Sequence, residues 1–242
     1  MDRAELFNRC SRSPRKLLGS ALPSGATIAD VGCGTMWKTF LYAFLPRRDV
    51  HVVGVEKTDD STIYGINAVP EYVRATGCFT LRGSDIEREP LPFDDASVDG
   101  VFLSHVIEHV EDRARLAREI ARILKPGGYA YVETPGPRST ILPRHSRLYR
   151  EGSPYPLNYL DDPSHLGEPM TLDALRGVLS DAGFEIRASG LHREFGRLFV
   201  PAYALAVLLG MLPFAFPGRL QLLGFGWWNL VGWPIYAFAR KK

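Results

Sequence analysis

The sequence predicts an α/β fold in which a mostly parallel sheet carries helices on both faces. Short apolar runs alternate strictly with helical stretches through the middle of the chain. This order implies right-handed crossovers between parallel strands. Glycine, proline or a capping residue marks the end of most of these segments. The 242 residues, 45% hydrophobic and 23% charged, suffice for one globular domain with an elaboration.

The predicted strands are short runs rich in β-branched and apolar residues. The first, TIADV, ends at a glycine turn, and the fifth, YAYVETP, ends at a proline. We expect six strands in this part of the chain, at residues 27–31, 50–56, 78–85, 98–104, 129–135 and 185–190.

Three stretches between these runs have helical character. Residues 38–45 look helical and should stop at Pro46. Residues 112–128 have helical apolar spacing and a glycine stop. Residues 171–184 begin at Thr171, a good N-cap. The basic N-terminal stretch is expected to form a solvated first helix or an arm.

Charge and cysteine content exclude some classes of protein. Lys and Arg total 29 against 27 Asp and Glu, a net charge of +2, so we expect no nucleic-acid partner. The three cysteines form no disulfide framework, which indicates a reducing compartment. Residues 1–18 have no apolar core and do not resemble a secretory signal. We therefore expect a cytoplasmic protein.

A glycine-containing bend follows the first strand, in the sequence DVGCGTM at residues 30–36. In open α/β sheets, ligands bind beyond the carboxyl ends of the strands. Gly32 and Gly34 allow a sharp turn and a close approach of the backbone to a ligand. The helix that begins near Thr35 would then present unpaired N–H groups.

Two acidic residues strengthen the prediction of a nucleoside site. Glu56 ends the second strand, 26 residues after Asp30, where it would accept hydrogen bonds from both ribose hydroxyls. Asp85 ends the third strand, where it would face the exocyclic amine of adenine. The sequence has no Gly-x-x-x-x-Gly-Lys phosphate loop, so these residues indicate adenosine without a polyphosphate.

Five segments, in this order and spacing, resemble the class I S-adenosylmethionine-dependent methyltransferases. They are IADVGCGTM, VVGVE, GSDIE, LPFDDASVDGVFLSHVIEHV and ILKPGGYAYVETP. The chain is most similar to the type-11 group, which includes ubiquinone-biosynthesis and other small-molecule methyltransferases. The resemblance covers roughly residues 25–190. It implies a Rossmann-like, seven-stranded sheet with the last strand antiparallel.

The resemblance also implies S-adenosylmethionine as cofactor and a set of residues that bind it. Those at the bend would hold the methionine part, Glu56 the ribose, and Asp85 with Ile86 the adenine. Ser104, at the end of the fourth strand, would lie against the methionine part. The expected cofactor-binding residues are Asp30, Gly32, Cys33, Gly34, Glu56, Asp85, Ile86 and Ser104.

One position departs from the family pattern. Met36 stands where the family usually has a third glycine, and the bulky Trp37 follows it. The Met36 side chain must either point away from the cofactor or narrow the pocket. The second case leaves open an alternative function, a catalytically impaired methyltransferase-like binding subunit at the membrane.

Residues 105–109 read His-x-x-Glu-His, a pattern typical of zinc hydrolases. That function needs His105 and His109 on one helix, but VDGVFLS predicts a strand that ends beside His105. The metal-dependent hydrolase therefore stays a remote alternative. Ubiquinone-type O-methyltransferases carry Glu-x-x-Glu-His here and bind a divalent cation. His105 replaces the first glutamate, so the match is incomplete and we assign no metal ligands, although metal binding by Glu108 and His109 stays open. Glu108 and His109 could instead simply hold the helix start.

Transfer of a methyl group to a hydroxyl requires a group that accepts its proton. The candidate catalytic residues are His105, His109 and His165, the last in LDDPSHLGEPMT. In related methyltransferases a segment of this kind borders the acceptor pocket, although a loop histidine could also tie down a turn. We expect O-methylation rather than C- or N-methylation. Tyr149, Tyr155 and Tyr159 would either line the acceptor site or lie exposed.

A long apolar segment precedes the C-terminal strand. Residues 198–218 and 220–239 contain no charged residue, although prolines interrupt the first stretch. Residues 233–242, WPIYAFARKK, resemble the last strand of the methyltransferase sheet. We thus predict a methyltransferase domain at 1–194 and 233–242, with an apolar helical insert at 195–232.

The insert has three candidate roles. It would make peripheral membrane contact through 198–232, with Trp227, Trp228 and Trp233 as interfacial anchors. It would otherwise roof the acceptor pocket or form a dimer interface or covering layer. The expected methyl acceptor is a small molecule or a lipid-linked one.

Overall fold

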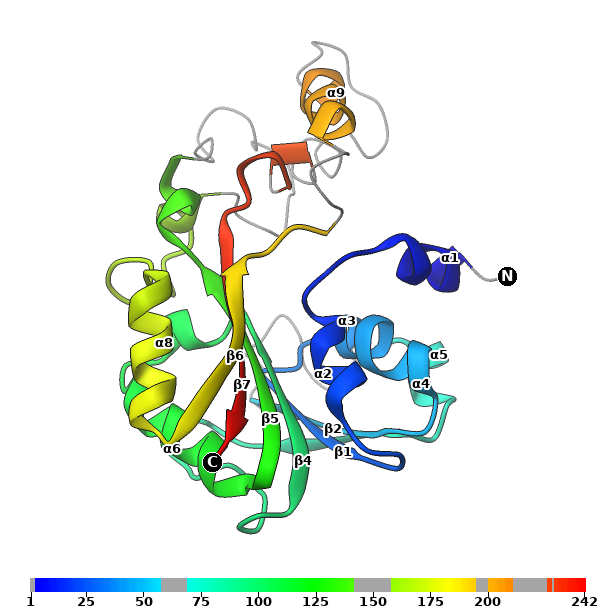
Figure 1. Ribbon diagram of the computed structural model, residues 1–242, viewed down its shortest axis with the longest axis vertical. Helices are drawn as coiled ribbons and strands as arrows, with labels where there is room; N and C mark the ends of the chain where they lie inside the picture. Colours follow the sequence, from blue (N-terminus) through cyan, green and yellow to red (C-terminus); the bar gives the residue numbers. More distant parts are fainter. Residues whose placement is uncertain (1–2, 58–68, 142–157, 195–199, 211–225, 228) are drawn as a thin grey trace.

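A computed structural model describes residues 3–57, 69–141, 158–194, 200–210, 226–227 and 229–242. One sheet of seven strands organises this part of the chain, in the order β3-β2-β1-β4-β5-β7-β6 (Figure 1). The five strands from β3 to β5 pair in parallel, and β7 is antiparallel to both β5 and β6. The predicted seven-stranded sheet with an antiparallel last strand is confirmed.

The strands lie close to the predicted runs. They are β1 (Thr27–Val31), β2 (His51–Glu56), β3 (Phe79–Gly83), β4 (Val98–Ser104), β5 (Leu124–Pro135), β6 (Phe184–Leu191) and β7 (Pro234–Lys241). Because β1 to β5 are parallel, their carboxyl ends meet at one edge of the sheet. That edge faces the N-terminal arm and the helix α9 (Val200–Gly210) (Figure 1).

Helices cover both faces of the sheet (Figure 1). On one face lie α6 (Arg113–Ile123) and α8 (Leu172–Asp181). The helices that follow the N-terminal α1 (Arg3–Cys10) cover the other face. They are α2 (Lys16–Ala21), α3 (Trp37–Thr39), a π-helical stretch (Phe40–Phe44), α4 (Leu45–Arg47) and α5 (Glu71–Arg74). Short 3₁₀-helices span Ile107–His109, Pro137–Ile141 and Tyr159–Asp161.

Two helix ends differ from the sequence prediction. The helical stretch that begins at Trp37 continues through Pro46 and ends at Arg47. The turn that precedes Pro46 is π-helical, and the Leu45 N–H donates to the Phe40 carbonyl. Helix α6 ends at Ile123 rather than near residue 128. A proline disfavours the helical backbone at the residue before it. Because Lys125 precedes Pro126, the helix cannot continue, and the chain enters β5 at Leu124.

The core forms two layers, one on each face of the sheet. On the α6 and α8 side, leucine, isoleucine and valine side chains dominate. On the other side, Met36, Phe40, Phe102, Tyr131 and Phe238 give an aromatic-rich layer. The predicted N-cap of α8 is confirmed, since Ala174 N–H bonds Thr171 Oγ1 at 3.2 Å.

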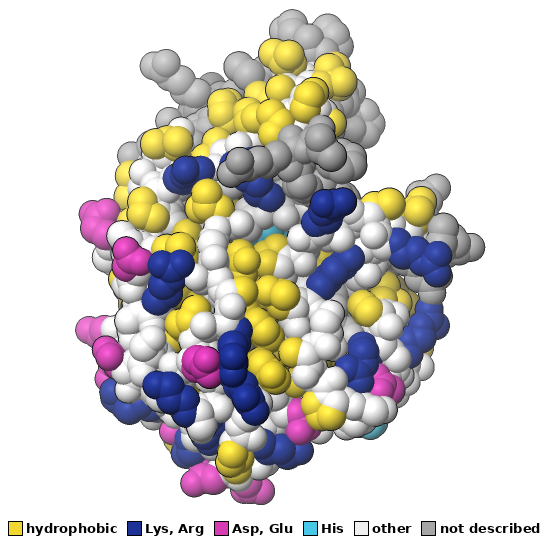
Figure 2. All heavy atoms as spheres, in the orientation of Figure 1, with side chains coloured by type: hydrophobic (Ala, Val, Ile, Leu, Met, Phe, Trp, Pro, Cys, Tyr) yellow, Lys and Arg dark blue, Asp and Glu magenta, His cyan; other side chains and the backbone are white. Residues whose placement is uncertain are grey.

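One apolar helix, α9 (Val200–Gly210), lies between β6 and β7. Leu205, Leu208 and Leu209 on it are exposed. Figure 2 shows hydrophobic side chains gathered over this helix at one end of the molecule. Among the described residues, no helix is both long and apolar enough to cross a membrane. The predicted residues Tyr149, Tyr155 and Trp228 lie outside the described residues.

Trp233 corrects one expectation about the insert. Its side chain is only 8% exposed, and its ring lies 5.3 Å from the His105 ring. A buried indole that contacts the end of β4 cannot be an interfacial anchor. Trp227 is half-buried.

The packing around Gly54 yields a stability prediction. A Cβ there would lie 1.9 Å from Met36 Cε and 2.6 Å from Cys33 Sγ. Gly54→Ala should therefore lower the free energy of unfolding by about 1–3 kcal/mol through overpacking. Met36→Ala in the same chain should recover part of that loss, as measured by urea denaturation.

A matched control exists in Gly177, which lies inside α8, where a Cβ would meet no neighbouring side chain within 4 Å. Gly177→Ala should raise the free energy of unfolding by roughly 0.5–1 kcal/mol, because alanine favours the helix. Equal effects of the two glycine replacements would contradict the packing described at Gly54.

Candidate functional site

The bend after β1 has a backbone that only glycine adopts easily at two of its positions. Gly32 and Gly34 have φ of +65° and +49°. A Cβ on Gly32 would lie 2.3 Å from Val106 Cγ2. The Gly32 and Cys33 N–H groups donate to the Val55 carbonyl at 2.9 and 3.2 Å. The bend is therefore packed against β2 and against the segment after β4.

Glu56 joins this bend to the end of β2. Its carboxylate accepts hydrogen bonds from the Gly34 N–H at 2.9 Å and from the Lys57 N–H at 3.1 Å. Asp85 follows β3, the next strand, and its carboxylate lies 3.5 Å from Lys57 Nζ. The structure thus places Glu56 and Asp85 at one edge of the sheet, with Lys57 between them. Ile86 is half-buried beside the core.

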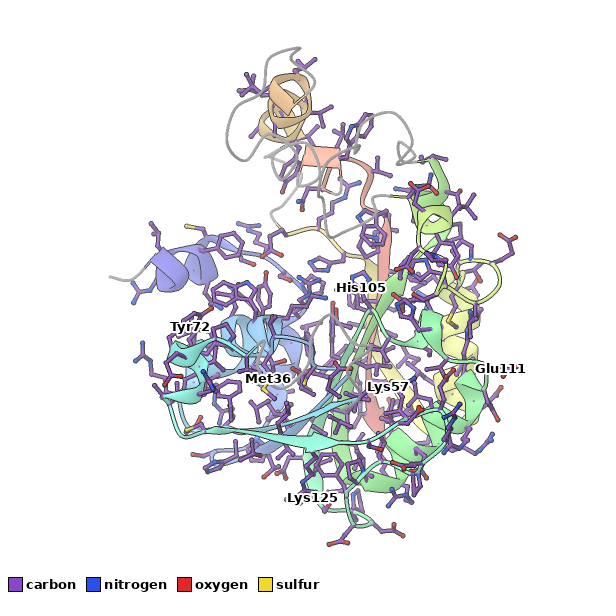
Figure 3. The ribbon with its side chains drawn as sticks, turned by 180° about the vertical axis from the view of Figure 1, so that it is seen from behind. Met36, Lys57, Tyr72, His105, Glu111 and Lys125 are labelled. Carbon is purple, nitrogen blue, oxygen red and sulfur yellow. The ribbon has the colours of Figure 1, made fainter. Side chains whose placement is uncertain are left out.

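Met36 points away from the bend and into the core. Its side chain is 2% exposed although its φ is +54°, a strained value for this residue. Its Cε lies against Gly54 of β2. Trp37 is 39% exposed, and its ring stacks on Phe40 at 5.9 Å. In Figure 3, Met36 lies among the side chains on the helical side of β1 and β2.

Asp30 and Cys33 are buried beside the bend. Burial raises the pKa of Asp30 to about 7, although the hydrogen bond from Thr39 Oγ1 lowers that pKa to a smaller extent. Burial also raises the pKa of the Cys33 thiol, and the carboxylates of Asp30 and Glu56 add to this. The Cys33 side chain therefore packs as a small apolar group.

A buried carboxylate, Glu133 on β5, organises the other half of this edge. It is fully buried and accepts hydrogen bonds from Tyr131 Oη at 2.7 Å and Ser104 Oγ at 3.2 Å. Arg15 and His192 also bond it. Burial alone would raise the pKa of Glu133, but the positive charge of Arg15 and the contact with His192 hold it well below its usual range.

The same cluster ties together segments far apart in the chain. Glu194, after β6, accepts hydrogen bonds from Ser11 Oγ at 2.6 Å and from Tyr42 Oη at 2.7 Å. His192 Nε2 lies 3.0 Å from Ser13 Oγ. The N-terminal arm is therefore bound to the segment that follows β6, at the start of the insert.

His105 lies at the end of β4 with both ring nitrogens facing carboxylates. Nε2 is 3.1 Å from Glu133 Oε1, and Nδ1 is 3.3 Å from Glu108 Oε1. Its φ of +60° ends the strand. The 3₁₀-helix at Ile107–His109 begins after it, so His105 and His109 do not share the continuous helix that the hydrolase needs.

His109 and His165 form a second group, with ring centroids 4.8 Å apart. His109 Nδ1 lies 3.2 Å from the Ser164 carbonyl, and His165 Nδ1 lies 2.7 Å from the Tyr159 carbonyl. Since a carbonyl only accepts, each Nδ1 carries the proton of its hydrogen bond. His165 Nε2 lies 3.7 Å from Asp162 Oδ2. Glu108, His109 and His165 each offer one side-chain atom of a kind that can bind a metal ion, and these atoms lie within 4.8 Å of one another.

Tyr159 is buried and stacks on the His165 ring at 4.2 Å, so the expectation of an exposed loop tyrosine is wrong there. Four further residues at this edge, Arg15, Lys38, Glu133 and His192, were not predicted from the sequence. An acidic residue within the apolar run YAYVETP was one available sign of a buried polar site.

Comparisons with known proteins identify the family and the fold of the chain. Residues 29–132 match the family described as a methyltransferase domain of type 11. A probable S-adenosylmethionine-dependent methyltransferase of Mycolicibacterium smegmatis is 34% identical over 163 residues, which cover 67% of this chain and 53% of that protein. A similar protein of Mycobacterium tuberculosis is 32% identical over 157 residues, 65% of this chain and 48% of that protein. The chain thus spans about half the length of these curated relatives.

Solved structures show the same fold at low sequence identity. An S-adenosylmethionine-dependent methyltransferase from Mesorhizobium loti matches with a TM-score of 0.57 at 19% identity, over 93% of this chain and 96% of that one. One from Archaeoglobus fulgidus matches with a TM-score of 0.56 at 19% identity, over 99% and 100%. The family match and the curated relatives place the chain in the type-11 group of class I S-adenosylmethionine-dependent methyltransferases, and the solved structures show that it has a methyltransferase fold.

Proposed function

We propose that this protein transfers a methyl group from S-adenosylmethionine to an oxygen atom of a small or lipid-linked acceptor. The observation that carries the proposal is the Glu56 carboxylate, which accepts a hydrogen bond from the Gly34 N–H at 2.9 Å. Asp85, which follows the next strand, lies 3.5 Å from Nζ of the adjacent Lys57. An acidic pair beside a glycine bend, at the carboxyl edge of a parallel sheet, has the chemistry that a ribose and an adenine need.

In this proposal the cofactor lies across the carboxyl ends of β3, β2, β1 and β4. Asp85 and Ile86 face the adenine, and Glu56 the ribose. The methionine part lies over the bend and reaches the end of β4. The residues assigned to it are Asp30, Gly32, Cys33, Gly34 and Ser104. The burial of Met36 supports a working pocket over the impaired binding subunit, since its side chain fills core space.

The three candidate histidines differ in their hydrogen bonding. Both ring nitrogens of His105 lie within 3.3 Å of a carboxylate oxygen, so we assign this residue an electrostatic and orienting role. His109 and His165 each direct Nδ1 to a carbonyl, so in the neutral ring Nε2 is the atom that can accept a proton. We assign His165 as the general base, because Tyr159 stacks on its ring and fixes it. Most of the rate enhancement comes from alignment of the acceptor with the sulfonium methyl group.

The buried ring of Trp233, the residue that follows the insert, lies beside His105 and supports a pocket roof at this end of the insert. The exposed leucines of α9 support contact of the insert with a lipid surface, which would bring a greasy acceptor to the site. A cytoplasmic location, the absence of a nucleic-acid partner and the assignment of no metal ligands stay predictions.

Replacement of the two acidic residues tests the cofactor site. Glu56→Gln and Asp85→Asn should each weaken binding of S-adenosylhomocysteine by roughly 10–100-fold, because each removes a charged hydrogen-bond acceptor. Isothermal titration calorimetry measures this. Glu185→Gln, on β6 and away from the bend, is the control and should bind as the unchanged protein does. Unchanged binding by both acidic-site variants would refute the assignment.

The general base is tested by His165→Gln. With pooled phenolic acceptors, we expect the release of S-adenosylhomocysteine to slow by about 10²–10⁴-fold while the affinity for S-adenosylhomocysteine stays the same. His51→Gln, at the exposed start of β2, should leave the rate unchanged. A His165→Gln variant as fast as the starting protein would remove this residue from the mechanism.

Membrane contact is tested by changing Leu205, Leu208 and Leu209 to serine together. Sedimentation with phosphatidylcholine and phosphatidylglycerol vesicles should show binding that falls about tenfold or more in this variant. Leu160→Ser with Leu166→Ser, exposed leucines elsewhere, serves as the control. If the starting protein does not sediment with vesicles, the lipid contact is wrong.

A further inference from the structure

Lys38 is a partly buried cation at the proposed site with few partners. It lies in α3, four residues after Gly34, and its Nζ donates to Ser104 Oγ at 3.0 Å. In the described part of the chain, no carboxylate oxygen lies within 4.0 Å of Lys38 Nζ, and Ser104 Oγ is its one hydrogen-bond acceptor. An ammonium has three N–H donors, so two remain for a ligand.

Three acidic groups act on Lys38, namely Glu133, Glu108 and Asp30, and Glu133 and Asp30 are already bound to other residues. Glu108 accepts a hydrogen bond from Thr134 at one oxygen, and its other oxygen, Oε1, has no hydrogen-bond partner among the described residues. Glu133 is held by Arg15, Tyr131 and His192. Asp30 accepts from Thr39. Burial and, to a smaller extent, the charge of Arg15 lower the pKa of Lys38 to about 8, while the acidic groups oppose this change. A desolvated ammonium with no paired anion is unfavourable, and buried charges in proteins are normally paired.

The position of Lys38 matches one end of the cofactor in the proposed function, on which this inference rests. With adenine at Asp85 and ribose at Glu56, the methionine part extends past the bend to the end of β4. Lys38 meets Ser104 at that point. The methionine part carries one anionic group, its carboxylate. A charge-assisted hydrogen bond from an ammonium to a carboxylate is among the stronger polar contacts in proteins.

We propose that Lys38 binds the methionine carboxylate of S-adenosylmethionine, and that its hydrogen bond to Ser104 holds Nζ in place to do so. Lys38 is then a specificity-determining residue, because it favours the intact amino-acid end over adenosyl ligands that lack the carboxylate. The alternative is a purely structural lysine that ties α3 to β4.

The test pairs a change in the protein with a matched change in the ligand. Decarboxylated S-adenosylmethionine differs from S-adenosylmethionine only in the absent carboxylate. We expect the unchanged protein to bind S-adenosylmethionine roughly 10–100-fold more tightly than the decarboxylated form, as measured by calorimetry. In Lys38→Met, binding of S-adenosylmethionine should weaken by a similar factor, and binding of the decarboxylated ligand should not weaken.

Two further variants complete the design. Lys38→Arg keeps a cation and should keep a clear preference for the carboxylate, which also serves as the test if Lys38→Met does not fold. Lys125→Met removes a lysine that pairs with Asp99 at 2.7 Å, at the opposite end of the sheet from His105 (Figure 3), and should leave both affinities unchanged.

The outcomes separate this inference from the function beneath it. If Lys38→Met weakened both ligands equally, or left the ratio of their affinities as it was, Lys38 would be structural and the inference overturned while the proposed function stood. If the unchanged protein bound neither ligand, the proposed function and this inference would both be wrong.

Discussion

The hydrogen bond from the Gly34 N–H to the Glu56 carboxylate is the contact on which the site depends. It fixes the bend after β1 against the end of β2, and it requires a backbone with positive φ at Gly32 and Gly34. The same bend packs so closely on Val106 that a Cβ at Gly32 would collide with it. One short segment therefore sets the positions of the ends of β1, β2 and β4 together.

A second constraint acts at the other half of the same edge. Glu133 is buried completely and is stable there only because Arg15, Tyr131, Ser104 and His192 supply its hydrogen bonds and compensating charge. These partners come from the N-terminal arm, β4, β5 and the segment after β6. The cluster thus closes the arm and the base of the insert over the ends of the strands, beside His105.

The sheet and the nucleoside half of the site could be predicted from the sequence because their signals are local. Apolar runs mark the strands, Glu56 is the last residue of β2, and Asp85 comes two residues after the end of β3. The Glu133 cluster could not be predicted in the same way. Arg15 is 118 residues from Glu133 in the chain, and His192 is 59 residues from it, so only the folded sheet brings them together. The orientation of Met36 was equally hidden, since it depends on the space beside Gly54 on a neighbouring strand.

The central claim is that Glu56 and Asp85 hold the sugar and the base of one adenosyl ligand. The crystal structure of the complex with S-adenosylhomocysteine tests it most directly. We expect both ribose hydroxyls within hydrogen-bond distance of the Glu56 carboxylate and the adenine amine beside Asp85. A ligand bound elsewhere, or a nucleoside at this edge that contacts neither carboxylate, would contradict the claim.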